Sequence, residues 1–190
     1  MMIKDWKKDL FTIPNWLSLF RLVLIPVYIT LYLHAQTTRD YIIAAIVLAV
    51  SCFTDFLDGR IARKYNMISR IGKILDPVAD KMTQFSLLIT LTRNYMPLRY
   101  LSGLFVIKEG FQLIASILLL RKKKILKGAH MAGKVCTTVL FISLIILLLF
   151  RNLPYYVVVG ITLTDSVFML ISFYEYIRIF SGHGDHIEEL

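Results

Sequence analysis

The chain has 190 residues, of which 57% are hydrophobic and only 18% are charged, and its formal net charge is +9. Soluble domains use about 25% charged residues, so the composition excludes an ordinary soluble domain and favours a membrane protein. The length suits one compact membrane domain.

The predicted elements begin with a short basic and aromatic segment. Residues 1–12 mix Trp6, Leu10 and Phe11 with lysines, which indicates an amphipathic helix lying in the membrane interface; a disordered basic tail is the alternative. Apolar stretches of about 20 residues, enough to cross a hydrocarbon core of roughly 30 Å, follow at about 15–34, 40–57, 75–93, 98–120, 131–150 and 154–180. We therefore predict an all-α integral membrane protein with six transmembrane helices in one domain over residues 13–181, then a polar tail over 182–190.

Lysine and arginine concentrate in alternate connections between these stretches. The basic residues are Lys4, Lys7 and Lys8 before the first stretch; Arg60, Arg63, Lys64, Arg70 and Lys73 between the second and third; and Arg121, Lys122, Lys123, Lys124 and Lys127 between the fourth and fifth. Short loops rich in lysine and arginine stay cytoplasmic, so we expect a multi-pass protein of the cell membrane with both termini in the cytoplasm. Topology and anionic lipid headgroups explain the charge, and no nucleic acid partner is needed.

Four aspartates stand out because they interrupt the apolar pattern. Asp55 and Asp58 are three residues apart, and Asp76 and Asp80 are four apart. Each pair shares one helix face, provided that the second helix continues through Arg63. A short basic connection over residues 64–73 makes the two helices antiparallel neighbours, so we expect the four carboxylates to converge.

A charged aspartate deep in a membrane costs roughly 2.5–3.5 kcal/mol, which calls for a compensating partner. Carboxylate oxygens suit hard divalent cations, and two such ions side by side can hold phosphoryl groups during displacement. The alternatives are a network of surface ion pairs and, as a different class of function, a non-enzymatic divalent-cation carrier. Gly59, Ala62, Arg63 and Gly72 at fixed offsets have no reason to accompany a cation pathway.

The spacing Asp55-x2-Asp58-Gly59-x2-Ala62-Arg63-x8-Gly72-x3-Asp76-x3-Asp80 resembles the signature of the CDP-alcohol phosphotransferases. Two further segments, IPNWLSLFRLVLIPV (residues 13–27) and LDPVADK (residues 75–81), are similar to bacterial phosphatidylglycerophosphate synthases. The resemblance implies a six-helix fold, usually homodimeric, in a bacterial inner membrane, with a polar cavity open to the cytoplasm. It also implies transfer of a phosphatidyl group from CDP-diacylglycerol to an alcohol with release of CMP.

The resemblance assigns roles residue by residue. Asp55, Asp58, Asp76 and Asp80 would hold two Mg²⁺ or Mn²⁺ ions, and Asp80 would also be the general base. The residues expected to contact the CDP-lipid are Pro14, Asn15, Gly59, Ala62, Arg63, Ser69 and Gly72. For Pro14, an ordinary proline at a helix start is the alternative, and both readings are compatible.

The acceptor alcohol is expected to be glycerol 3-phosphate, because Lys108 and Lys134 are intramembrane cations suited to a phosphate. The alternative is that Glu109 pairs with a lysine to make its burial tolerable. Phosphatidylglycerophosphate synthases typically have Arg-Glu where this chain has Lys108-Glu109, and a lysine does not replace a bidentate guanidinium. A cardiolipin synthase of the same superfamily, with phosphatidylglycerol as acceptor, is therefore the rival.

The remaining polar and sulfur side chains point to no second centre. Cys52 and Cys136 fall in apolar stretches and suit buried packing. His130 fits an interfacial position or a proton carrier at the cavity mouth, and Asp165 fits a polar contact between helices, with no catalytic role assigned. Phe168, Phe173, Tyr174 and Tyr176 are expected to pack or to form interface belts.

Overall fold

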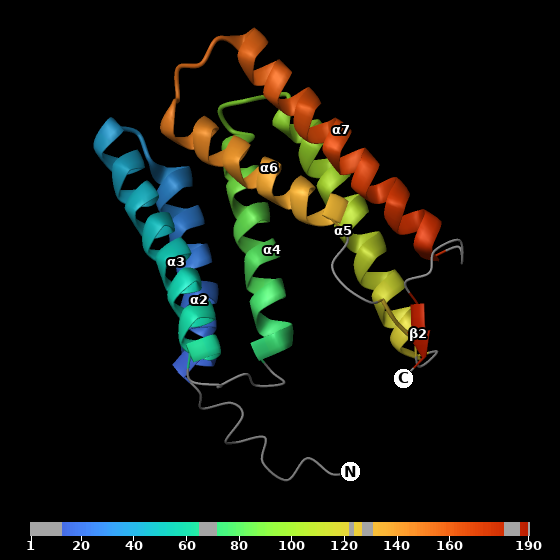
Figure 1. Cartoon of the computed structure of the whole chain (residues 1–190). Helices are drawn as coiled ribbons and strands as arrows, with labels where there is room; N and C mark the ends of the chain where they lie inside the picture. Colours follow the sequence, from blue (N-terminus) through green and yellow to red (C-terminus); the bar gives the residue numbers. More distant parts are fainter. Residues whose placement is uncertain (1–12, 65–71, 122–123, 127–130, 181–186, 190) are drawn as a thin grey trace. The chain divides into compact units, whose positions relative to one another are not determined.

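The computed structural model describes residues 13–64, 72–121, 124–126, 131–180 and 187–189 of the chain (Figure 1). The helices are α2 (Ile13–His34), α3 (Thr38–Lys64), α4 (Gly72–Leu91), α5 (Leu98–Arg121), α6 (Met131–Leu149) and α7 (Tyr155–Phe180). The six predicted helices are confirmed. The interfacial segment predicted for residues 1–12 and most of the polar tail lie outside the described residues.

Two strands were not predicted. β1 (Lys124–Leu126) and β2 (Ile187–Glu189) pair antiparallel, with Ile125 opposite Glu188. Each has three residues, too few for the alternation of apolar and polar side chains that reveals a strand in a sequence.

Four of the described helices are long and apolar enough to cross a membrane, and they identify the chain as a multi-pass membrane protein. These spans are Asn15–His34, Thr38–Arg60, Met131–Leu149 and Tyr155–Phe180. The helices α4 and α5 are not among these four. Membrane crossing by α4 and α5 stays a prediction.

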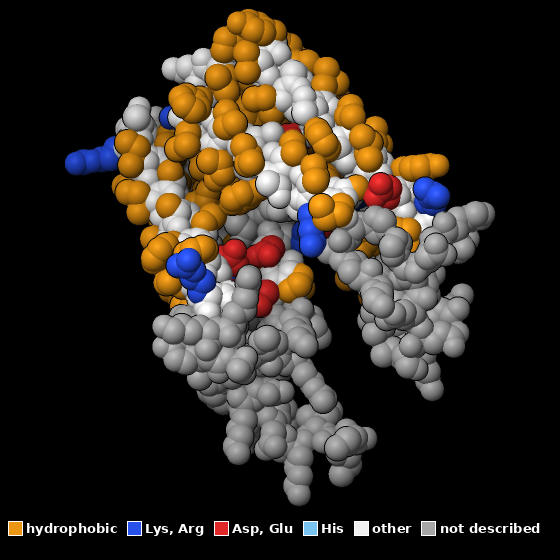
Figure 2. Space-filling model, viewed as in Figure 1, with side chains coloured by type: hydrophobic (Ala, Val, Ile, Leu, Met, Phe, Trp, Pro, Cys, Tyr) orange, Lys and Arg blue, Asp and Glu red, His pale blue; other side chains and the backbone are white. Residues whose placement is uncertain are grey.

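The chain divides into two compact units, Met1–Thr90 and Leu91–Leu190. In both, large apolar side chains are exposed on the outer helix faces, among them Val23 and Phe53 in the first unit and Leu113 and Leu163 in the second (Figure 2). Water would penalise such surfaces, whereas lipid tails accept them. A smaller set of polar side chains is buried among apolar ones in each unit.

In the first unit, α2 packs closely along α3, and a short turn joins the two helices. The Asp40 carboxylate accepts hydrogen bonds from the backbone N–H groups of Gln36 (3.0 Å) and Thr37 (2.8 Å), and the Asp40 N–H donates to the Thr37 hydroxyl (3.3 Å). This reciprocal pair is a capping box, which fixes where α3 begins.

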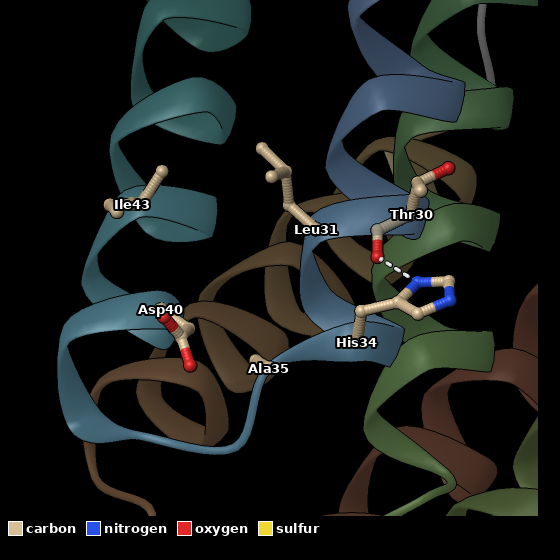
Figure 3. A pocket seen from close by; sticks show the side chains of 6 residues that line it. All are labelled: Thr30, Leu31, His34, Ala35, Asp40 and Ile43. Atoms are coloured by element: carbon tan, nitrogen blue, oxygen red, sulfur yellow. Dashed lines mark hydrogen bonds between the residues drawn. The ribbon is translucent and has the colours of Figure 1, made fainter.

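A small hollow of about 270 Å³ lies beside this turn (Figure 3). Its polar side chains are engaged locally, since Asp40 caps α3 and the His34 ring lies 2.9 Å from the Thr30 carbonyl oxygen. The polar groups of the hollow therefore stabilise the turn between α2 and α3 and the end of α2.

The inner face of α2 changes character along its length. Its first half places Asn15, Ser18 and Arg21 at three-residue spacing, and all three are buried. Its second half is aromatic: Tyr28 donates or accepts a 3.0 Å hydrogen bond with Thr90 on α4, and Tyr32 packs edge-on against Tyr41 on α3 with ring centroids 5.1 Å apart. Residues three and four apart share a helix face, so one stripe of α2 serves both ends of the unit.

In the second unit, α7 contacts both α5 and α6. Phe111 packs edge-on against Phe173 (centroids 5.3 Å apart), and the Gln112 amide donates to the Tyr176 hydroxyl (2.9 Å). The Ser143 hydroxyl on α6 donates to the buried Asp165 carboxylate on α7 (2.9 Å). The polar interhelical contact expected for Asp165 is therefore confirmed.

Tyr95, between α4 and α5, closes the end of α6. Its buried hydroxyl lies 3.0 Å from the Phe150 carbonyl oxygen and 2.9 Å from that of Arg151, just beyond the last helical residue. Burial raises the pKa of the Tyr95 phenol, so it remains a hydrogen-bond donor at neutral pH.

We expect Tyr95→Phe to destabilise the protein by about 1 kcal/mol, because the carbonyl oxygens at the end of α6 lose a hydrogen-bond donor. A thermal melt of the detergent-purified protein should show Tm lower by roughly 2–4 °C. The control is Tyr100→Phe. The Tyr100 side chain is 84% exposed, so the loss of its hydroxyl should leave Tm unchanged. Equal melting of the two variants would contradict the assigned role.

Candidate active site

The four aspartates surround one cavity at the end of the first unit. Helix α3 extends to Lys64, as the spacing argument required, and presents Asp55 and Asp58; the first turns of α4 present Asp76 and Asp80. All four line a cavity of about 720 Å³, together with Phe56, Gly59 and Arg60. In the space-filling view acidic side chains gather in this hollow (Figure 2). The predicted convergence of the carboxylates is confirmed.

A third helix contributes the counter-charge. Arg21 of α2 is only 1% exposed, and its guanidinium lies among the carboxylates. Its Nη2 is 2.7 Å from Asp58 Oδ2 and also contacts Asp55 Oδ1, while its Nη1 is 2.6 Å from Asp80 Oδ1. One buried cation therefore joins three acidic side chains from two other helices.

Ser18 lies one turn before Arg21 on the same face of α2. Its hydroxyl oxygen is 2.6 Å from Asp76 Oδ1 and 3.2 Å from Asp58 Oδ2. Since a hydroxyl has one hydrogen to donate, the shorter contact to Asp76 is the stronger one. Through Ser18 and Arg21, α2 touches all four carboxylates.

Sequence reasoning did not single out Ser18 or Arg21, although both lie in the segment IPNWLSLFRLVLIPV. A signal was present for Arg21: a lone cation inside an apolar stretch marks a functional position by default. Ser18 had none, because serine is common in membrane helices.

The charges at the site do not balance. Four carboxylates against the guanidinium groups of Arg21 and Arg60 leave a formal charge of −2. Asp58 is buried, while Asp55 and Asp80 are about half exposed. Oxygen-only donors with excess negative charge fit hard divalent cations in their chemistry. Within the described part of the chain, however, no three acidic, histidine or cysteine side chains are spaced to hold an ion as they stand. One oxygen each of Asp55, Asp58 and Asp80 is in contact with Arg21.

The other residues expected to contact the CDP-lipid fall into three groups. Gly59 lines the cavity, and Asn15 is buried on the α2 face that carries Ser18 and Arg21. Four are placed by backbone only, their side chains lying outside what the structure describes: Pro14 in α2, Ala62 and Arg63 at the end of α3, and Gly72 at the start of α4. Ser69 lies outside the described residues.

Residues 11–173 match the model of the CDP-alcohol phosphatidyltransferase family. The chain belongs to this family. The match covers most of the chain and includes all four aspartates as well as the α2 face that contacts them.

Individual relatives of this chain carry two different names. A CDP-diacylglycerol–glycerol-3-phosphate 3-phosphatidyltransferase of Rickettsia bellii is 40% identical over 83 residues, covering 43% of this chain and 45% of the relative. The Escherichia coli protein of the same name is 38% identical over 85 residues, or 45% and 46% of the two chains. A CMP-forming cardiolipin synthase of Streptomyces coelicolor is 36% identical over 141 residues, covering 73% of this chain and 65% of the relative. The chain thus spans less than half the length of two of these relatives and about two thirds of the third.

The residues expected to bind the acceptor lie in the second unit. Lys108 is 2% exposed, and its ammonium lies 2.7 Å from Glu109 Oε1. This is the pairing named above as the alternative to acceptor binding, and it does not exclude the other. Lys134 is exposed in the first turn of α6, and His130 lies outside the described residues.

Removing the charge of Glu109 should leave the buried Lys108 ammonium without its anion. We expect Glu109→Gln to lower the free energy of unfolding by about 1–2 kcal/mol, less than for a fully buried pair because Glu109 keeps some exposure. Lys108→Met together with Glu109→Gln should restore most of the loss, because no uncompensated charge remains. Chemical denaturation in detergent measures both, and a double variant less stable than the single one would contradict the pairing.

Proposed function

We propose that this protein transfers the phosphatidyl group of CDP-diacylglycerol to an alcohol and releases CMP. The observation that carries the proposal is the meeting of Asp55, Asp58, Asp76 and Asp80 around one cavity, in a chain of the CDP-alcohol phosphatidyltransferase family. Carboxylates from two helices at one cavity can serve both as ligands for cations and as a base beside them.

Asp80 is the residue we assign to proton transfer. Its side chain is 51% exposed, so an incoming hydroxyl can reach it, whereas Asp58 is buried. In the reaction the acceptor oxygen forms a bond to the β-phosphorus of the CDP-lipid, the bond from that phosphorus to the CMP oxygen breaks, and Asp80 takes the hydroxyl proton. A positioned general base is needed because a neutral alcohol is a weak nucleophile.

Asp55, Asp58 and Asp76, with Asp80, are the residues that would hold two Mg²⁺ or Mn²⁺ ions. When bound, such ions neutralise charge on the diphosphate and stabilise the leaving CMP. Ser18 keeps Asp76 turned toward the cavity through its 2.6 Å hydrogen bond. Gly59 lines the cavity without a side chain, which permits close approach of a nucleotide to the helix backbone.

The remaining contacts to the CDP-lipid follow from the family resemblance. Arg63 would pair with the diphosphate through its guanidinium fork, Ser69 would lie near the cytidine, and Pro14 and Asn15 would contact the CDP group. Ala62 and Gly72 would leave space for it. Six membrane crossings, a cytoplasmic site and a homodimer belong to the same proposal.

For the acceptor we propose glycerol 3-phosphate, with Lys108 and Lys134 binding its phosphate. One support is the sequence Gly133-Lys134-x2-Thr137 in α6, which resembles the Gly-Lys-x2-Thr typical of phosphatidylglycerophosphate synthases. The other is the names of the R. bellii and E. coli relatives. The second candidate is phosphatidylglycerol, the acceptor of a cardiolipin synthase, because the S. coelicolor relative aligns over a longer stretch.

We expect Asp80→Asn to lower CMP release from CDP-diacylglycerol by at least about 10³-fold, since the amide cannot accept the proton. The matched control is Asp40→Asn on α3, where an amide can replace the carboxylate as a cap, and its rate should stay within about twofold of wild type. The assay follows CMP with Mg²⁺ or Mn²⁺ present. Equal rates for Asp80→Asn and wild type would remove Asp80 from the mechanism.

An acceptor screen separates the two candidates. With glycerol 3-phosphate, phosphatidylglycerol, serine and inositol phosphate offered in turn, we expect CMP release with glycerol 3-phosphate and a lipid product that retains its phosphate. Turnover with phosphatidylglycerol alone would make the protein a cardiolipin synthase. Absence of CMP with every alcohol would overturn the proposed reaction.

A further inference from the structure

We propose that Arg21 is a positioning residue that competes with divalent cations for the aspartates, so that α2 sets the affinity of the site for its ions. The inference rests on the proposed function only in taking the ions to be ligands of these aspartates. It concerns a residue that neither the sequence motif nor the family's acidic signature contains.

The competition follows from which atoms Arg21 touches. Its two terminal nitrogens contact one oxygen each of Asp55, Asp58 and Asp80. Carboxylate oxygens are also the ligands that Mg²⁺ and Mn²⁺ would need there. Each carboxylate keeps a second oxygen, so an ion that gathers these three side chains would lie beside the guanidinium and share the carboxylates with it, or would displace it.

Charge makes sharing unfavourable. Arg21 is almost completely buried, so little water screens it, and a single positive charge within a few ångströms of a doubly charged ion is strongly repelled. Coupling between two binding events is reciprocal. If a bound ion weakens the contacts of Arg21 with the carboxylates, those contacts weaken the binding of the ion by the same factor.

The guanidinium is also held in a way that permits displacement. Its buried Nε–H has no hydrogen-bond partner among the described residues, so the network around it is incomplete. Among the residues that the structure describes, its side-chain contacts are to these three carboxylates. Once those carboxylates turn to an ion, nothing else described retains the head group.

The alternative is that Arg21 is merely structural. The two roles predict opposite changes in ion affinity when Arg21 is removed. A structural arginine preorganises the aspartates, so removing it would spread them and weaken ion binding. A competing arginine withholds their oxygens, so removing it would tighten ion binding.

The test is a Mn²⁺ titration of the purified full-length protein, in which electron paramagnetic resonance reports free Mn²⁺. We expect Arg21→Met to lower the Kd for Mn²⁺ by about tenfold, within the range of coupled sites. Arg21→Lys should lower it by only about threefold, because the ammonium keeps the charge but cannot contact three carboxylates at once. The half-saturating Mg²⁺ concentration for CMP release should fall in the same order.

Arg60→Met is the matched control. Arg60 lines the same cavity and carries the same charge, but it is exposed and lies over the Phe56 ring, with its guanidinium carbon 4.6 Å from the ring centroid. Its removal should change the Kd for Mn²⁺ by less than about twofold, because water screens exposed charges. Gel filtration and thermal melts check that each variant is folded.

Unchanged or weaker Mn²⁺ binding in folded Arg21→Met would overturn the proposal, as would absence of Mn²⁺ binding in wild type. If Arg21→Met does not fold, Arg21→Lys decides: a lower Kd for Mn²⁺ than in the wild type supports the proposal, and an unchanged or higher Kd overturns it. If the wild type releases CMP but the Arg21 variants bind Mn²⁺ no more tightly than it does, the role of Arg21 is refuted and the proposed reaction stands. If the Arg21 variants show the lower Kd for Mn²⁺ but the wild type never releases CMP, the proposed reaction is refuted and the role of Arg21 stands.

Discussion

Mutual repulsion among four carboxylates is the constraint around which the first unit is built. Asp55 and Asp58 on α3 and Asp76 and Asp80 on α4 line one cavity, and without a counter-charge their helices would be driven apart. Arg21 supplies that charge from α2 by contacting three of the four, and Ser18 holds the fourth by a hydrogen bond. The positions of three helices therefore depend on a few short polar contacts.

The rest of the first unit keeps those contacts in register. The capping box at Thr37 and Asp40 fixes where α3 starts after the turn. The aromatic half of α2 packs on α3 and α4, through Tyr32 against Tyr41 and Tyr28 against Thr90. The same stripe of α2 carries Ser18 and Arg21 at its other end, so both sets of contacts hold one face of α2 against α3 and α4.

The second unit uses buried polar contacts differently. Lys108 pairs with its neighbour Glu109, and Asp165 accepts from Ser143 across two helices. Each is a local solution to the cost of burying a polar group in an apolar setting. Such contacts support helix packing, and the Lys108–Glu109 pair does not exclude the acceptor role that we propose for Lys108.

Much of this protein could be read from its amino-acid order, because the strongest signals are local. Apolar length predicts six helices, and the spacing of Asp55, Asp58, Asp76 and Asp80 predicts two acidic faces on neighbouring helices, since helical periodicity alone decides which residues share a face. The arrangement of those residues with Gly59, Ala62, Arg63 and Gly72 also indicated the family. Only the tertiary structure decided that Arg21 and Ser18, more than 30 residues earlier in the chain, contact these aspartates. That pairing depends on how α2 lies against α3 and α4, and no periodicity within α2 specifies which partner its polar stripe will face.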